Sequence, residues 1–208
     1  QSISTYEYDT SDRRILRSVT KNGGTTETEY RYSGQYVVAE ITGEVEKRYV
    51  RGQEYLMSDS AGNEEFYVYN GHGDVVQLLN AAGNTVENYA YDIFGAPVQE
   101  PETSTNAIRY AGEFYDVETG LYYLRARYYN PGIGRFITED TYPGSRSDPN
   151  SLNRYTYCYN DPINYTDPTG HFPFGIFGGI LGTLMGGGLG AALGTAIGGA
   201  LDAATDTG

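Results

Sequence analysis

The chain has 208 residues, enough for one domain or two small ones, with 22 tyrosines, 28 glycines and no tryptophan. Its net charge of -13 disfavours nucleic acid and anionic membrane surfaces as partners, because both attract basic faces. The single cysteine excludes an internal disulfide framework. Tyr and Thr favour strands, whereas Gly, Asn and Asp favour turns, so the composition predicts an all-β fold. The chain opens within a strand-like pattern without a recognisable signal peptide, and we expect it to be a piece of a longer protein.

Residues 1–100 repeat a strand–turn–strand pattern. The units read "TYEYDTSDRRILRSVTKNGG", "EYRYSGQYVVAEITG", "KRYVRGQEYLMSDSAG", "FYVYNGHGDVVQLLNAAG" and "NYAYDIFGAPVQE". Alternation places Tyr67 and Tyr69, or Tyr89 and Tyr91, on one face of a strand. A lone hairpin cannot bury its own face, so we expect the units to stack into one continuous sheet. The tyrosine face is predicted to be packed rather than to bind carbohydrate, and His72 in "NGHGD" is predicted to be a turn residue.

The next segment, residues 107–170, combines aromatic, cationic and acidic residues. In "GLYYLRARYYNPGIGRFITEDTYPG", Gly132 and Gly134 are predicted to turn the chain between strands. Cys158 in "YTYCYN" is predicted to be a small buried residue.

Two of the aspartates in this segment form a candidate catalytic pair. Aspartyl hydrolysis needs two carboxylates that share one proton, one to activate water and one to protonate the leaving group. Asp140 and Asp167 are separated by a turn-rich stretch that could fold back and join them. The alternative is that Asp161 and Asp167 only begin Asp-Pro turns, and residue chemistry alone favours this alternative over a catalytic pair.

The final segment changes composition abruptly. Residues 174–201 carry no charge, and Gly178, Gly182, Gly186, Gly190, Gly194 and Gly198 recur every fourth residue. At helical period these glycines form a stripe that permits close helix contact, and 28 residues suffice to span a bilayer. We predict a membrane-active, helical segment; the alternative is an apolar linker held inside a shell.

The repeats and the following segment resemble a known family. The pieces "YNGHGDVV" and "YDIFGAPV" resemble the YD repeats of Rhs proteins. Residues 107–170 resemble the Rhs repeat-associated core through "YAGEFYDVETGLYYLRARYYNPGIGRFITED" and "SLNRYTYCYNDPINYTDPTG". The resemblance implies stacked β-hairpins that form part of a hollow shell, and a core that spirals inward as a plug. Residues 171–208 would then begin a C-terminal toxin region.

The resemblance also implies a self-cleaving site. Its two aspartates fall on Asp140 and Asp167, and its arginine falls on Arg127. The cut would lie between His171 and Phe172, just after "DPTG". This chain departs from the family at Thr141, where Pro is frequent, and at His171, where Leu is frequent. Arg125 and Arg135 are interpreted as structural or surface charges.

We therefore predict a secreted or surface-exposed bacterial toxin shell that encloses its own C-terminal effector and releases it by aspartyl self-cleavage. The implied partners are the rest of the shell, the effector, an immunity protein and a secretion machinery. No cofactor or metal is implied, since the two histidines lie far apart in sequence. The alternative is a non-catalytic scaffold or adhesin with a vestigial site.

Overall fold

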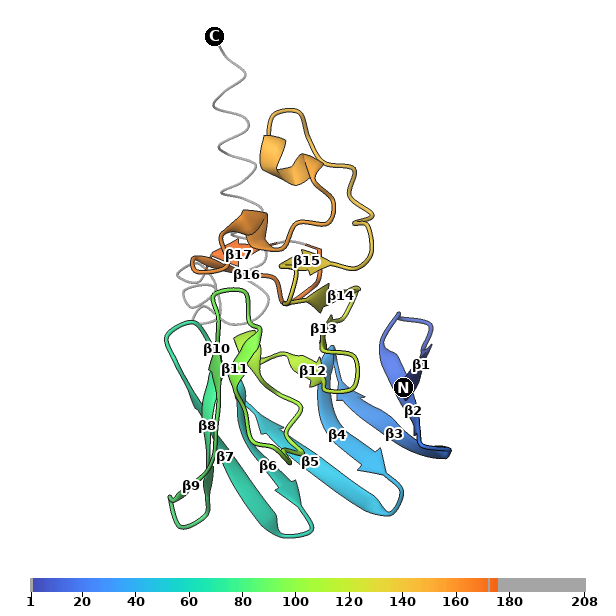
Figure 1. Cartoon of the computed structure of the whole chain (residues 1–208), viewed down its shortest axis with the longest axis vertical. Helices are drawn as coiled ribbons and strands as arrows, with labels where there is room; N and C mark the ends of the chain where they lie inside the picture. Colours follow the sequence, from blue (N-terminus) through green and yellow to red (C-terminus); the bar gives the residue numbers. More distant parts are fainter. Residues whose placement is uncertain (1, 172, 176–208) are drawn as a thin grey trace.

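The computed structural model describes residues 2–171 and 173–175, and in these the chain is built of strands and short 3₁₀ turns (Figure 1). Nine antiparallel strands pair in chain order to form one sheet. They are β1 (Ser2–Tyr8), β2 (Arg14–Lys21), β3 (Gly24–Ser33), β4 (Tyr36–Thr42), β5 (Val45–Arg51), β6 (Tyr55–Ser60), β7 (Asn63–Tyr69), β8 (Val75–Asn80) and β9 (Thr85–Asn88). The predicted continuous sheet of stacked hairpins is confirmed.

An Asp or Asn after the aromatic pair builds the turn of several repeats. The side-chain oxygen of Asn70 accepts the backbone N–H of His72 at 2.9 Å and of Asp74 at 3.0 Å. Asp92 makes the same pair of bonds to the residues two and four positions on. This local side-chain bonding is why Asp and Asn favour such turns. It explains the Tyr-Asp and Tyr-Asn pairs in the repeated pattern.

The second aromatic residue of a repeat marks a β-bulge and ties neighbouring units together. The register shifts between Arg31 and Tyr32, and again between Val68 and Tyr69. The Tyr32 hydroxyl donates to the Arg14 carbonyl at 2.8 Å, and the Tyr69 hydroxyl to the Tyr55 carbonyl at 2.8 Å. These two repeats thus satisfy a carbonyl of the preceding unit, where a bulge interrupts the ladder.

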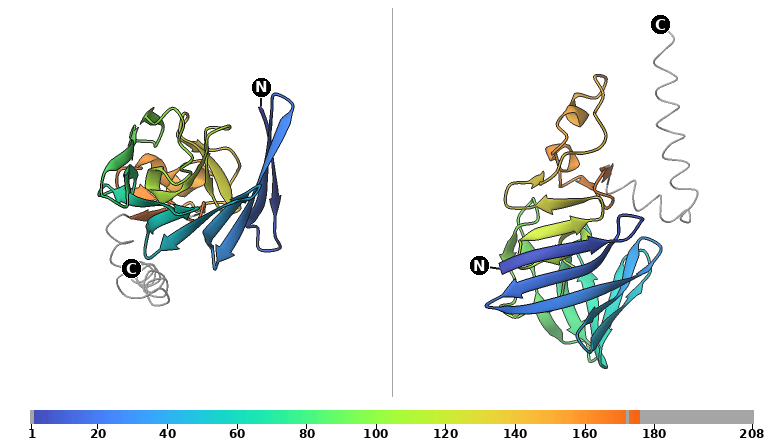
Figure 2. Two further views of the ribbon diagram at one scale, coloured as in Figure 1. Left: turned by 90° about the horizontal axis from the view of Figure 1, so that it is seen from below. Right: turned by 90° about the vertical axis from the view of Figure 1, so that its right-hand side faces the viewer.

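The concave face of the sheet packs against the core segment, which lies inside its curve (Figure 2). Phe114 is the central contact. Its ring meets those of Tyr30, Tyr49 and Tyr55 edge-to-face, with centroids 5.9 to 6.3 Å apart, a favoured geometry for aromatic pairs. The tyrosine face is therefore packed, as predicted.

The core segment forms a second, four-stranded sheet in chain order. Its strands are β12 (Phe114–Asp116), β13 (Leu121–Leu124), β14 (Arg127–Asn130) and β15 (Arg135–Phe136), and the pair β10 (Ala90–Tyr91) and β11 (Pro97–Gln99) precedes it. Three 3₁₀ turns, η1 (Tyr110–Gly112), η2 (Pro149–Leu152) and η3 (Cys158–Asn160), and the pair β16 (Tyr165–Thr166) and β17 (Phe174–Gly175) complete the described part.

A separate aromatic cluster fills this core. Tyr129 and Tyr157 stack with ring centroids 4.0 Å apart, and Phe136 packs edge-on against both. Cys158 is buried in the same cluster, as predicted. This cluster joins β14 and β15 to the segment that leads into η3.

The glycine stripe from Gly178 to Gly198, which the sequence predicts to be helical, lies outside the described residues. Within residues 2–171 and 173–175, no helix has the length and hydropathy that crossing a membrane requires.

Candidate functional site

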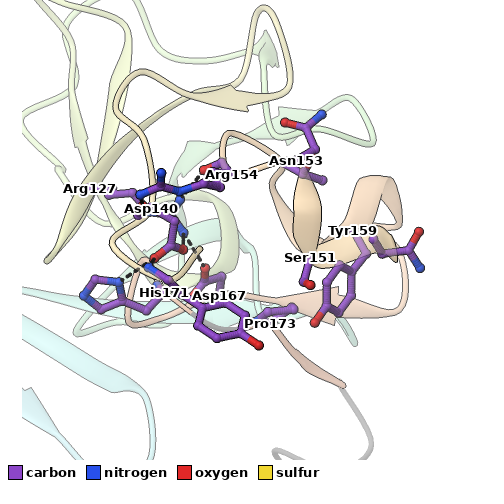
Figure 3. A pocket seen from close by; sticks show the side chains of 12 residues that line it. Arg127, Asp140, Ser151, Asn153, Arg154, Tyr159, Asp167, His171 and Pro173 are labelled. Atoms are coloured by element: carbon purple, nitrogen blue, oxygen red, sulfur yellow. Dashed lines mark hydrogen bonds and ion pairs between the residues drawn. The ribbon is translucent and has the colours of Figure 1, made fainter. Parts of the chain in front are cut away.

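Three separate segments bring Arg127, Asp140 and Asp167 together (Figure 3). Arg127 begins β14, Asp140 follows β15, and Asp167 follows β16. The side chains are buried, with residue exposures of 5%, 8% and 2%. The fold-back that sequence spacing left open is therefore present.

Arg127 is the centre of the arrangement. Its Nη2 lies 2.7 Å from Asp140 Oδ2 and 3.7 Å from Asp167 Oδ2. Nη1 donates to the Arg154 carbonyl at 2.9 Å, and Nε donates to the Gly170 carbonyl. The rigid fork of a guanidinium suits such a multi-point role.

The surroundings of Arg127 keep it rigid. Its guanidinium carbon lies 3.6 Å from the centre of the Phe136 ring. Burial lowers the pKa of Arg127 from its ordinary value, and the charges of Asp140 and Asp167 oppose this change. An arginine remains charged in proteins despite such a shift, so Arg127 supplies a fixed positive charge between two carboxylates.

Asp167 has two roles, one for each carboxylate oxygen. Its Oδ1 accepts the backbone N–H of Thr169 at 3.3 Å and of His171 at 3.2 Å, the bonding pattern of the repeat turns. Its Oδ2 is the oxygen that faces Arg127. The geometry is thus compatible with both interpretations of Asp167, as a turn former and as a site carboxylate.

Gly170 lets the "DPTG" turn approach the hairpin between β13 and β14. Its φ of +72° is strained for any residue with a Cβ, and a Cβ would overlap the Leu124 carbonyl oxygen and lie 3.0 Å from Arg127 N. Arg125 also holds this turn, because its Nη1 donates to the Pro168 carbonyl and to Glu113 at 2.9 Å.

Sequence reasoning missed the roles of Gly170 and Arg154. A signal for Gly170 existed, since an Asp or Asn followed three residues later by Gly marks the repeat turns at Asn70 and Asp92. Arg154 donates to the Asp140 carbonyl and pairs with Glu139. No local sequence pattern predicts these two contacts.

His171 meets both carboxylates. Its backbone N–H reaches Asp167, and its Nδ1 lies 3.3 Å from Asp140 Oδ1. The Tyr142 N–H donates to the same Asp140 oxygen at 2.9 Å. Phe172, the other side of the predicted cut, lies outside the described residues.

A small cavity of about 40 Å³ adjoins these side chains, lined by Arg127, Asp140, Asp167 and His171 together with residues 142, 150–151, 153–154, 156, 159 and 173. A cavity of this size with polar walls can hold water. Among the described residues, no group of three or more His, Cys, Asp or Glu side chains could bind a metal ion. Because the cavity can hold water and is lined by Asp140 and Asp167, a water molecule can lie beside the carboxylate pair that Arg127 orients.

The comparisons with known proteins agree with this architecture. The family model described as Teneurin YD-shell matches residues 1–163. The chain belongs to the YD-shell family. This confirms the predicted relation to YD-repeat proteins and the all-β repeat fold.

Several relatives of this YD-shell chain carry informative names. The tRNA nuclease WapA of Bacillus subtilis (strain 168) is 40% identical over 177 residues, which are 82% of this chain and 8% of WapA. The toxin protein Tse5 of Pseudomonas aeruginosa is 36% identical over 98 residues, 47% of this chain and 7% of Tse5. The chain thus spans less than a tenth of these relatives.

Solved structures show the same fold. The crystal structure of TcdB2-TccC3-Cdc42 superposes with a TM-score of 0.66 at 20% identity, and covers 81% of this chain and 9% of the compared chain. The structure of TcdB2-TccC3 without its hypervariable C-terminal region gives a TM-score of 0.65 at 22% identity. Identities at this level establish the fold alone.

Proposed function

We propose that this chain is part of a toxin shell whose core cuts its own backbone between His171 and Phe172 and so frees a C-terminal effector. The observation that carries the proposal is the position of Arg127 Nη2, within 3.7 Å of oxygens from both Asp140 and Asp167. The names of the relatives, a tRNA nuclease and a toxin protein, support the toxin setting.

The proposed reaction is hydrolysis of one peptide bond. The ionised carboxylate accepts a proton from a water molecule as the water oxygen attacks the carbonyl carbon of His171. The protonated carboxyl group gives its proton to the backbone nitrogen of Phe172, and the C–N bond breaks. One water is consumed, and the products are a new carboxylate on residue 171 and a new amine on residue 172.

The structure supports an assignment of the two roles. Arg127 lies 1 Å closer to Asp140 (2.7 Å) than to Asp167 (3.7 Å), so Asp140 is the carboxylate that Arg127 holds and orients most directly. Asp140 would therefore be the general base and Asp167 the general acid. Arg127 would orient both, without taking part in the proton transfers.

The free edges of the sheet support the shell. Among the described strands, β1 and β9 each pair along one side only. Such edges offer unpaired backbone groups to further strands, and the remainder of the shell would supply them. We propose that the enclosed effector follows residue 171 and that the assembly acts outside the producing bacterium. An immunity protein and a secretion machinery would be its partners, and 174–201 would act at a membrane.

The experiment that tests the site is a cleavage time course of the full chain and its Asp→Asn variants. Asn keeps the oxygen that builds the turn at residue 167 but cannot transfer a proton. Asp140→Asn and Asp167→Asn are expected to cleave at least about 100-fold more slowly than the wild type. Asp161→Asn is the matched control, because Asp161 only holds a nearby turn by accepting hydrogen bonds from Asn164. This variant should cleave at the wild-type rate.

Cleavage of both site variants at the wild-type rate would overturn the proposal. A folded wild type that stays uncut would instead favour the non-catalytic scaffold. One observation favours that alternative: both oxygens of Asp140 already bind protein groups in this structure, Oδ1 to Tyr142 and His171 and Oδ2 to Arg127.

A further inference from the structure

His171, the residue just before the proposed cut, takes no part in the proton transfers of the proposed reaction. The side chain before the cut bond has only to be accommodated, yet His171 makes a polar contact with the site. Its Nδ1 lies 3.3 Å from Asp140 Oδ1, and its side chain is 47% exposed. An exposed imidazole could have turned toward solvent, so its contact with a catalytic carboxylate is informative.

This contact fills an acceptor position on the proposed base. A carboxylate oxygen accepts about two hydrogen bonds. The Tyr142 N–H already donates to Asp140 Oδ1 at 2.9 Å, and His171 Nδ1 is the second partner of the same oxygen. The other oxygen, Oδ2, faces Arg127 at 2.7 Å. A water that is to lose its proton to Asp140 must therefore compete with the imidazole.

His171 is also held through its backbone. Its backbone N–H is bound by Asp167 Oδ1 at 3.2 Å and by Thr169 Oγ1 at 3.2 Å. These two bonds fix the backbone of residue 171, and the side chain is thereby kept next to Asp140.

We propose that His171 is a positioning residue that restrains self-cleavage by occupying Asp140 Oδ1, so that the chain cuts itself slowly until the imidazole leaves. This inference rests on the proposed aspartyl self-cleavage. It makes the identity of residue 171 a determinant of rate. A residue without a donor at this position would leave the oxygen free for water.

The test compares the cleavage rates of four full-length chains after a pulse of cell-free synthesis: the wild type, His171→Leu, His171→Ala and His171→Asn. Leu and Ala lack the donor. Asn carries an amide nitrogen close to the position of Nδ1, so it conserves the hydrogen bond with a side chain about the size of Leu. His171→Leu and His171→Ala are expected to cleave at least about tenfold faster, the factor that a hydrogen bond to a charged group contributes.

His171→Asn is expected to keep the slow rate, which a purely steric role of residue 171 would not explain. If Leu and Ala cleave at the wild-type rate or more slowly while Asp140→Asn abolishes the cut, His171 does not restrain the base and this inference alone is wrong. If none of the four folded chains is cut, the proposed self-cleavage is wrong, and this inference, which rests on it, is wrong as well.

Discussion

Arg14 Nη1 lies 2.6 Å from Asp116 Oδ2, and both side chains are 1% exposed. Arg14 belongs to β2 of the repeat sheet, and Asp116 ends β12 of the core. The Arg14 guanidinium also lies over the Tyr30 and Tyr123 rings, 4.7 and 4.5 Å from their centres. This pair is a buried electrostatic link between the start of the described sheet and the plug inside it.

Removal of one member of this pair should destabilise the whole fold. Asp116→Asn leaves Arg14 charged, buried and without its counterion, and we expect a loss of about 3–5 kcal/mol in the free energy of unfolding. Urea denaturation checks this value. Arg48→Ala is the control, because Arg48 pairs with Glu46 on the exposed outer face and its removal should leave the denaturation midpoint unchanged. Equal midpoints for the two variants would contradict the proposed link.

Gly170→Ala should disrupt the candidate site more than a glycine substitution at a repeat turn. Both Gly170 and Gly43 have positive φ, +72° and +60°, so alanine is strained at either position by about 1–2 kcal/mol. Only at Gly170 would the added Cβ overlap the Leu124 carbonyl. We expect Gly43→Ala to cleave normally and Gly170→Ala to lose cleavage, as read from a denaturing gel. Normal cleavage by Gly170→Ala would show that the close approach of this turn is dispensable.

Glu40 should make the fold less stable as the pH rises. Burial raises the pKa of Glu40 above its ordinary value, although the Tyr49 hydroxyl donates to Oε2 at 2.9 Å. Its Oε1 is buried without a hydrogen-bond partner among the described residues. Because the folded state favours the neutral acid, this contribution is present below the ordinary pKa and is lost as the pH rises through the raised value.

Glu40→Gln should therefore stabilise the protein by about 1 kcal/mol at pH 7 to 8 and by nothing at pH 4. The measurement is the free energy of unfolding of both chains across this pH range. A gain of the same size at every pH would mean that charge at Glu40 is not its cause.

His72 should stabilise the attachment of the core most strongly at mildly acidic pH. Its Nδ1 lies 2.7 Å from Asp74 Oδ1, and its Nε2 lies 2.7 Å from the Pro162 carbonyl oxygen. Burial lowers the pKa of His72, but Asp74 and the Pro162 carbonyl outweigh burial and raise it overall. Both nitrogens face acceptors, so the doubly protonated ring is favoured.

The sign of this pH dependence is opposite to that of a paired carboxylate. The stability from His72 is complete below the ordinary histidine pKa and is lost as the pH rises through the raised value. His72→Phe keeps a ring against Tyr110 but loses both hydrogen bonds. It should be less stable than the wild type at pH 5.5, with the gap closing above pH 8. A stability difference between wild type and variant that stays the same at every pH would contradict a role for the protonated ring.

Features that depend on local periodicity were predicted from the sequence. The alternation of aromatic residues gave the stacked hairpins, and Tyr67 and Tyr69 do share a face, with ring centroids 6.3 Å apart. Contacts that join the repeats to the core were not predicted. Arg14 and Asp116 are 102 residues apart, and His72 and Pro162 are 90 apart. No periodic pattern carries information on such pairs, and His72 was predicted only as a turn residue.

The sequence also could not show that Asp167 has two kinds of contact at once. Residue chemistry offered Asp167 as either a turn former or a catalytic carboxylate, and the resemblance to Rhs cores favoured the second. In the structure, one oxygen of Asp167 builds the turn and the other faces Arg127. A sequence pattern assigns a residue one role at a time, whereas the geometry of a carboxylate allows two. The roles of Asp140, Asp167 and Arg127 in cleavage remain predictions.

The most direct test of self-cleavage is the intact mass of the full chain under denaturing conditions, measured beside Asp140→Asn. We expect two wild-type fragments whose masses place the cut between His171 and Phe172, and a single uncut mass for the variant. A single uncut mass for a folded wild type, or the same two fragments from Asp140→Asn, would contradict it.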